Sequence, residues 1–301
     1  MKRAVSISIG SSKRDKSVEV TLLGEQVRIE RIGTDGDMKK AAALFRELDG
    51  QVDAFGVGGA DLGIMVDTTF YPLRPVWKMI KDVKHTPVVD GAGLKNTLEY
   101  RIADALEAEI GDYLNQVGRR VLVATAADRW GMAASFVKAG YECTFGDLMF
   151  GLGIPIPFHN LETVRKFAAV VGPIVGYLPF EWVYPTGEKQ EQRIPKWGKY
   201  YQWASVIAGD CHYVRRHMPE HLNGKVIATN TTTERDVELF QQAGVKYLLT
   251  ATPVLDGRSF GTNMMEAALI AVSGKKRPLT REELNKMLDQ MDVRPQIREL
   301  N

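Results

Sequence analysis

The sequence predicts an α/β protein of two domains, an N-terminal α/β domain followed by a Rossmann-like domain built on a parallel sheet. Its 301 residues suit one large or two modest domains. Before Gly118 the chain mixes hairpin and helix patterns, and after it strands and helices alternate, which indicates a parallel sheet wrapped by helices. We therefore expect a substrate-side domain over residues 1–117 and a Rossmann-like domain with a returning C-terminal helix over residues 118–301.

The elements of the first domain follow from the spacing of apolar residues, which alternate in strands and recur at helical spacing in helices. Asp37 is placed to cap one helix, and Asn96 is placed to start another. The glycine-rich stretch 56–63 follows a strand and is interpreted as a turn. The expected elements are strands over 4–10 and within 17–33, a helix over 38–48, a strand over 52–59 and a helix over 97–114.

The second domain alternates buried strands with helices. Thr233, with Asp236 three residues later, predicts a capped helix start, and Thr280 predicts another for a tail helix. An irregular, proline-rich stretch over 151–203 interrupts the alternation. The expected strands are 120–126, 141–147, 204–210, 225–232 and 246–253, and the expected helices are 130–140, 161–171, 234–244, 262–274 and 280–291.

Composition argues against several classes of partner. The formal net charge of +2 gives no basic surface for nucleic acid or an anionic membrane. The two cysteines, Cys143 and Cys211, are too few for a disulfide framework and suit a reducing compartment. Charges follow the basic N-terminus at once, unlike a signal peptide, and glycine and proline interrupt the longest apolar stretch. We expect a cytoplasmic protein without nucleic-acid or membrane partners, and the sequence leaves open whether it forms a homo-oligomer.

The strand–turn–helix of residues 121–142 stands where a nucleotide-binding unit begins, yet its turn lacks the usual glycines. In such a unit the turn and the helix N-terminus hold a pyrophosphate, and an acid about 20 residues on binds the ribose. Asp147 lies at that distance, and an acid there favours NAD over NADP. The alternative is a plain turn in which Asp128 caps the helix. The residues expected at the cofactor are Thr125, Ala126, Arg129, Trp130 and Asp147.

The segment VLVATAADRWGMAASFVKAGYE resembles the nucleotide-binding unit of the shikimate/quinate 5-dehydrogenase family, with the glycine-rich turn replaced. Upstream, DGAGLKNTLEYRIADAL resembles that family's Asn-Thr-Asp segment beside the substrate. Downstream, VIATNTT and LLTATPVLDG resemble the strands beneath the nicotinamide, and the chain as a whole resembles bacterial proteins labelled quinate 5-dehydrogenase. The resemblance implies a dehydrogenase fold, an NAD or NADP cofactor and a small hydroxy or carbonyl acid as substrate.

The match to the family's site residues is partial. Asn96 and Thr97 match the Asn-Thr of the substrate motif, but Leu98 replaces the Asp that forms the family's catalytic pair with a Lys. Lys95 is a candidate general acid or base if burial lowers its pKa, and the alternative is a solvated surface charge. We therefore expect Lys95 and Asn96 as catalytic residues, and from the resemblance we expect Thr97 as a substrate contact.

A second candidate site follows the strand expected over 204–210. Asp210, Cys211 and His212 stand at its carboxyl end, where parallel sheets bind ligands. His212 is a candidate proton donor and Cys211 a candidate nucleophile, while Arg215, or Arg216 beside it, is placed to pair with a carboxylate of the substrate. The alternative is a surface turn followed by a short basic helix.

The same stretch is rich in histidine, which raises the question of a metal. His217 and His221 have i,i+4 spacing, and with Cys211 they are suitable zinc ligands. Pro219 between them disfavours a regular helix that presents both side chains on one face. We therefore assign no metal site.

Polar residues also follow the last two strands. Asn230 and Thr231 precede a helix N-terminus, whose backbone N–H groups and hydroxyls can bind a phosphate or carboxylate. Thr252 ends the last strand, and Arg258 in the next loop suits an anionic substrate. We expect Asn230, Thr231 and Thr252 at the cofactor and Arg258 at the substrate.

Together these patterns predict an NAD(P)-dependent oxidoreductase that acts on a small hydroxy or carbonyl acid. Two alternatives remain open. The first is a non-redox protein that binds an anionic metabolite in the same strand-end crevice, which the missing glycines and the missing catalytic Asp favour. The second is a metal- or thiol-dependent enzyme centred on Cys211 and His212.

Overall fold

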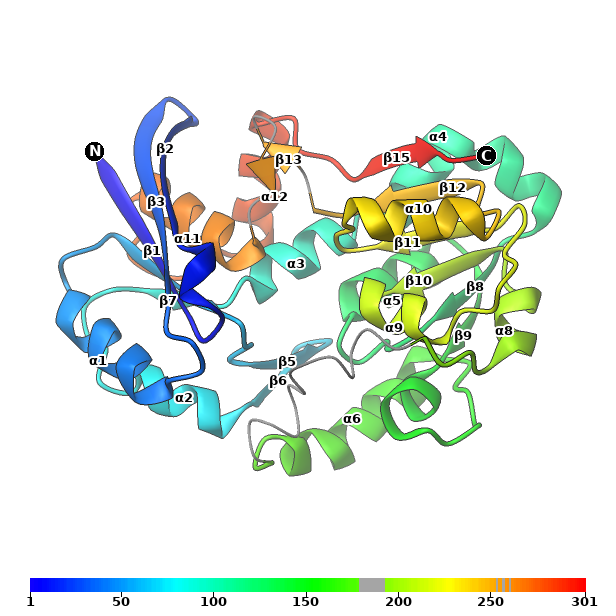
Figure 1. Cartoon of the computed structure of the whole chain (residues 1–301), viewed down its shortest axis with the longest axis horizontal. Helices are drawn as coiled ribbons and strands as arrows, with labels where there is room; N and C mark the ends of the chain where they lie inside the picture. Colours follow the sequence, from blue (N-terminus) through cyan, green and yellow to red (C-terminus); the bar gives the residue numbers. More distant parts are fainter. Residues whose placement is uncertain (179–192, 253, 256–257, 260) are drawn as a thin grey trace.

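The computed structural model describes residues 1–178, 193–252, 254–255, 258–259 and 261–301. Two α/β units stand side by side, each with parallel strands at the centre of its sheet, and the predicted fold class is confirmed (Figure 1). Between the two sheets lie helix α3 (Ala92–Glu99) and the hairpin of β5 (Gly63–Val66) and β6 (Thr69–Pro72).

Helices cover both faces of the first sheet. The side chains of its central strand alternate, so that Ala4 packs into the core on one face and Val5 into the core on the other. Strand β2 is antiparallel to β3, whereas β1 is parallel to both of its neighbours. In spatial order the strands are β2 (Lys16–Leu22), β3 (Glu25–Gly33), β1 (Lys2–Ser8), β4 (Ala54–Gly58) and β7 (Val88–Val89).

Both ends of the chain build the first unit. Helices α1 (Met38–Leu48) and α2 (Arg74–Ile80) pack on one face of its sheet. Helices α11 (Thr262–Ser273) and α12 (Arg281–Gln290), from the C-terminal part of the chain, pack on the other. The division at Gly118 stays a prediction, but packing groups α11 and α12 with the N-terminal sheet.

The second sheet is parallel except at one edge, where β15 runs antiparallel to β12. Helices α4 (Ile102–Val117), α5 (Trp130–Lys138) and α6 (Leu161–Val175) supply the core on one face. Helices α8 (Gly198–Trp203), α9 (Cys211–His217) and α10 (Glu234–Gln242) supply it on the other. In spatial order the strands are β9 (Glu142–Phe145), β8 (Arg120–Val123), β10 (Val206–Gly209), β11 (Val226–Thr229), β12 (Tyr247–Thr250) and β15 (Gln296–Glu299).

This strand order fixes where a ligand can bind. The chain starts at β8, adds β9 on one side and then β10, β11 and β12 on the other. The order reverses between β8 and β10, and open α/β sheets bind ligands outside the carboxyl ends of their strands at such a switch point. Thr125, Asp210 and Asn230 all follow strands at this edge.

One prediction about local structure is wrong, and one strand was not predicted. The helix expected to start at Asn96 is two helices, because α3 begins at Ala92 after Gly91 (φ 91°) and α4 begins at Ile102. A carboxylate from α11 helps to define that start, since the backbone N–H of Leu94 donates to Glu266 Oε2 at 3.0 Å. The patterns also gave no indication of β15, an edge strand with mostly exposed residues that pairs with β12 only in the folded chain.

Candidate functional site

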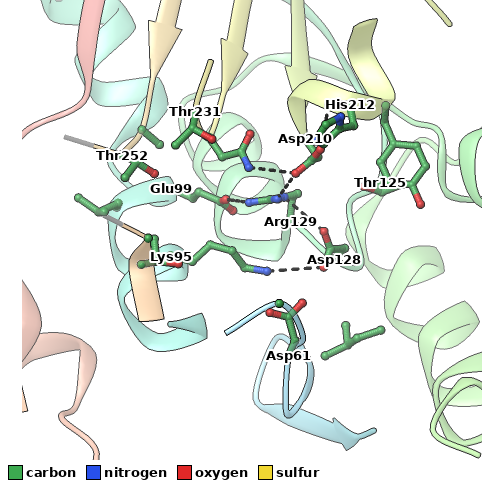
Figure 2. Close-up of a pocket in the computed structure, with 18 of the residues that line it drawn as sticks. Asp61, Lys95, Glu99, Thr125, Asp128, Arg129, Asp210, His212, Thr231 and Thr252 are labelled. Atoms are coloured by element: carbon green, nitrogen blue, oxygen red, sulfur yellow. Dashed lines mark hydrogen bonds and ion pairs between the residues drawn. The ribbon is translucent and has the colours of Figure 1, made fainter. Parts of the chain in front are cut away.

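A cavity of about 650 Å³ lies between the two units, at the carboxyl ends of the second sheet (Figure 2). Its walls come from the loops after β8, β10, β11 and β12, from α3 and from the loop after β4. Such a volume suits a small metabolite. The polar and charged residues that line it are Asp61, Lys95, Glu99, Thr125, Asp128, Arg129, Asp210, His212, Tyr213, Arg216, Asn230, Thr231, Thr252 and Thr262.

Arg129 is the centre of a buried ion network on one wall. Its Nη1 donates to Glu99 Oε1 at 2.6 Å, and its Nη2 donates to Asp210 Oδ2 at 2.5 Å (Figure 2). Burial alone would lower the pKa of Arg129, but the surrounding carboxylates outweigh it and raise that pKa. The guanidinium therefore stays charged, and it joins α3 of one unit to the strand ends of the other.

Asp210 is held in place from two further sides. Asn230 Nδ2 donates to Asp210 Oδ2 at 2.9 Å, which ties the end of β11 to the end of β10. The other carboxylate oxygen, Oδ1, accepts from the backbone N–H of His212 at 2.9 Å and caps α9. The structure thus brings together Asp210, His212 and Asn230, three of the predicted site residues.

Lys95 and Asp128 form a second ion pair in the cavity. Lys95 Nζ lies 3.5 Å from Asp128 Oδ1, and Asp61 faces the pair from the loop after β4 (Figure 2). Burial and the charge of Arg129 oppose the charge on Lys95, yet the carboxylates of Asp128, Asp61 and Glu99 together raise the pKa of Lys95. Burial likewise opposes the charge on Asp128, and Lys95 and Arg129 together lower its pKa. Asp61 differs, because burial raises its pKa.

The turn after β8 does not take the form expected of a pyrophosphate site. The carboxylate of Asp147 is buried, and its Oδ1 accepts from the backbone N–H of Ala127 at 2.8 Å. Asp147 therefore engages a backbone donor of the turn, and its carboxylate points into the turn and away from where a ribose would lie. It is not among the described residues that line the cavity. Burial raises the pKa of Asp147 to about 6, against the hydrogen bonds from the turn.

The start of α5 is also covered by the chain itself. A Cβ added to Gly131 would lie 2.7 Å from the backbone oxygen of Asn96, so this glycine lets α3 pack closely on α5. Ala126 and Trp130 are buried in the core. Asp128 does not cap α5, whose N-cap is Arg129 without a side-chain hydrogen bond, so the alternative of an Asp128 cap is wrong. Hence these residues do not fit a dinucleotide held at this turn by a Rossmann glycine loop.

Several other predicted site residues lie away from the cavity. Thr97 Oγ1 donates to the backbone oxygen of Gly93 at 2.8 Å, inside α3. Cys211 is buried, and burial raises the pKa of its thiol, which disfavours the reactive thiolate. Arg215 pairs with Asp236 at 2.8 Å. Arg258 lies in the short strand β14 (Arg258–Ser259), and its side chain is outside the described part of the chain.

The histidines of the same stretch are also apart from the cavity, except for His212. His217 Nδ1 lies 3.0 Å from the backbone oxygen of Ile194, and its ring stands edge-on to Phe150. Within the described ranges, no group of three or more His, Cys, Asp or Glu side chains is placed to hold a metal ion. In the same ranges no helix has both the length and the apolar character needed to cross a membrane.

Sequence reasoning did not select Asp61, Glu99 or Asp128 as site residues. Asp61 follows the glycine-rich turn after β4, and a polar residue after a buried strand was the available indication. Glu99 lies four residues after Lys95, so both side chains share one face of α3. Nothing in the sequence placed that face against the turn after β8.

Solved structures with low similarity to the chain include two kinds of protein. Malic enzyme from Entamoeba histolytica is 10% identical with a TM-score of 0.44, and the match covers 95% of this chain but only 61% of that one. Hetero-hexameric glutamate dehydrogenase from Thermus thermophilus is 13% identical with a TM-score of 0.44, covering 96% and 72%. The arabinose transporter's periplasmic binding protein from Shewanella sp. ANA-3 is 13% identical with a TM-score of 0.38, covering 96% and 97%. Likeness at this level carries no argument about activity.

Comparison with protein families divides the chain just before α3. No curated protein matches it. Residues 3–90 match the model described as Domain of unknown function (DUF8753), and residues 93–300 match Domain of unknown function (DUF8754). Neither description names a shikimate or quinate dehydrogenase, so that resemblance stays a prediction. Because the second model covers more than half of the chain, the protein belongs to the family described as Domain of unknown function (DUF8754).

Proposed function

We propose that the protein is an enzyme that binds a small metabolite with hydroxyl or carbonyl groups in the cavity and moves a proton at the carbon next to one of its carbonyl or carboxyl groups. The observation that carries this proposal is the Lys95–Asp128 pair, 3.5 Å apart inside the cavity, with Asp61 facing it from the other unit. A ligand that touches all three side chains has to lie between the two units.

The two kinds of charge in the cavity suit two roles. Lys95, whose pKa is raised, keeps its proton at neutral pH and stabilises negative charge that develops on a substrate oxygen. Asp61, whose pKa is raised by burial, is the group that gives or takes the proton. Asp128 holds the ammonium of Lys95 in position.

Unpaired oxygens in the cavity wall indicate what the ligand offers. Thr125 Oγ1 and Glu99 Oε2 are buried and have no hydrogen-bond partner among the described residues. Buried acceptors are nearly always satisfied, so a missing partner calls for a bound group. Hydroxyl groups of a ligand would supply the donors, which supports a hydroxylated metabolite as the substrate class.

The test incubates the protein with a set of hydroxy and keto acids in deuterated water. Nuclear magnetic resonance then measures how fast deuterium replaces the carbon-bound protons of each compound. The wild type is expected to label at least one compound, and Asp61→Asn to lower that rate by about 10²–10⁴-fold, the usual contribution of a general acid or base. Asp67→Asn is the matched control, since Asp67 lies in the turn between β5 and β6 and does not line the cavity. Unchanged exchange in Asp61→Asn would contradict the assigned role.

A second candidate is the oxidoreductase version, in which NAD or NADP accepts a hydride from a hydroxy acid. The position of the cavity at the switch point between β8 and β10 favours it. The engagement of the Ala127 N–H by Asp147 opposes the usual mode of dinucleotide binding. Calorimetric titration with NAD⁺, NADH, NADP⁺ and NADPH separates the two candidates, and binding of none of them leaves proton transfer alone.

A further inference from the structure

A second cavity, of about 320 Å³, lies over α9 and α10 and is dominated by arginine. Among the described residues that line it, Glu238 is the one acid. A cluster of guanidinium groups this close is unfavourable unless negative charge neutralises it. The four arginines, hereafter the arginine cluster, are Arg193, Arg215, Arg216 and Arg235.

The protein neutralises this cluster only in part. Arg215 pairs with Asp236, whose own role is to close the capping box of α10 with Thr233. Two further nitrogens, Arg193 Nη2 and Arg216 Nε, are buried and without a hydrogen-bond partner among the described residues. A buried donor on a charged group left unpaired is costly, and an unseen ion is a regular explanation for one.

Backbone hydrogen bonds hold the segment that carries Arg193 against the end of α9 before any ligand arrives. The N–H of Ile194 donates to the oxygen of Arg216 at 2.7 Å, and the N–H of Lys196 donates to the oxygen of His217 at 3.1 Å. Arg193 Nε also donates to the oxygen of Met218 at 3.2 Å. The segment that carries Arg193 therefore runs along the end of α9, and the two unpaired nitrogens are fixed in one cavity.

The surroundings are positive beyond the cluster itself. The pKa of His217 is lowered by burial first, and then by the charges of Arg216 and Lys196, against the contact with the Ile194 oxygen. Burial and these positive charges favour the neutral form of the His217 imidazole. The excess of arginine over acid among the described residues that line the cavity favours an anionic ligand over a cation or an apolar group.

We propose that the arginine cluster is a subsite for the phosphoryl group of the ligand. A phosphoryl group supplies at least three acceptor oxygens and up to two negative charges, and planar guanidinium groups bind it with paired, charge-assisted hydrogen bonds. Arg216 lines both cavities, so the subsite lies beside the cavity between the two units, hereafter the main cleft. This step rests on the proposed function, and it makes the substrate class a phosphorylated hydroxy or carbonyl metabolite.

The experiment is calorimetric titration of the full chain with inorganic phosphate and with pyrophosphate. The double variant Arg193→Gln/Arg235→Gln is expected to bind both at least tenfold more weakly than the wild type. The matched control, Arg46→Gln/Arg298→Gln, removes the same charge from two exposed positions elsewhere and is expected to bind like the wild type. Equal affinity in wild type and test variant, or an equal loss in both double variants, would overturn the subsite.

A third variant separates this inference from the proposed function. Asp61→Asn disables the proposed proton transfer but leaves the arginine cluster intact, and it is expected to bind phosphate like the wild type. If the wild type binds phosphate but exchanges no deuterium into any compound, the subsite is supported and only the proposed proton transfer fails. Loss of phosphate binding in Asp61→Asn would place the anion in the main cleft and overturn the subsite.

Discussion

Two kinds of contact hold the carboxylates in and around the main cleft. Cations hold Asp128 in the cleft, whereas backbone N–H groups hold Asp147 and Glu266, which do not line it. In the cleft, Asp128 lies 3.5 Å from Lys95 Nζ and 3.3 Å from Arg129 Nε. Behind it, Asp147 and Glu266 accept hydrogen bonds from backbone N–H groups, at the turn before α5 and at the start of α3. Both arrangements bury a negative charge at a helix start, but only the first supplies a cation.

The pKa values follow that difference. Cations lower the pKa of Asp128 although its partial burial opposes that shift. Burial raises the pKa of Asp147 to about 6 and that of Glu266 to about 7, because backbone amides offset only part of the lost hydration. The comparison teaches that a carboxylate keeps its charge where two cations face it, as at Asp128, whereas Asp147 and Glu266 serve to hold the chain.

The largest expected effect comes from removing the guanidinium of Arg129, which is more buried than the ammonium of Lys95. Arg129→Leu leaves Glu99 and Asp210 buried without their partner, and the free energy of unfolding should fall by about 3–5 kcal/mol. Urea denaturation measures it. Arg28→Gln, which breaks the exposed pair with Glu19, is the control and should cost no more than about 1 kcal/mol. Similar losses in the two variants would mean that the buried network contributes no more to the free energy of unfolding than an exposed ion pair does.

The carboxylates that are held by backbone amides should make the stability of the protein depend on pH. The folded-state pKa of Glu266 is about 7, against 4.5 for an ordinary glutamate, so the folded protein binds more protons than the unfolded one between these pH values. Stability from this group is therefore lost as pH rises from 4.5 to 7. Glu266→Gln lacks the titration, and the stability of the variant relative to wild type should rise by about 3 kcal/mol over that window. Parallel pH curves in urea denaturation would contradict the assignment.

The smallest effect tests whether Lys95 and Asp128 act as one unit. Lys95→Met leaves Arg129 as the one of these two cations that still contacts Asp128, and it should cost about 1–3 kcal/mol in urea denaturation. Asp128→Asn added to Lys95→Met should recover part of that loss, since the unpaired charge is then absent. Additive losses in the double-mutant cycle would show that the two residues do not interact.

The sequence by itself determined the elements whose pattern is local. The predicted cap Asp37 accepts from the backbone N–H groups of Lys39 and Lys40, and the predicted cap of α10 is a complete capping box between Thr233 and Asp236. The parallel strands of the second sheet were predictable because their apolar runs are short and continuous. That regularity also placed Asp210 and Asn230 at strand ends.

Only the tertiary structure decided which strand ends face each other and what each charge meets. Asp61 and Arg129 are far apart in sequence, and they share a cavity because the first unit stands against the switch point of the second. The same packing turned Asp147 onto the Ala127 N–H and brought Glu266 to the start of α3, 172 residues from Leu94. Periodicity describes contacts within one element, whereas the cost of burying a charge depends on partners that only the folded chain brings together.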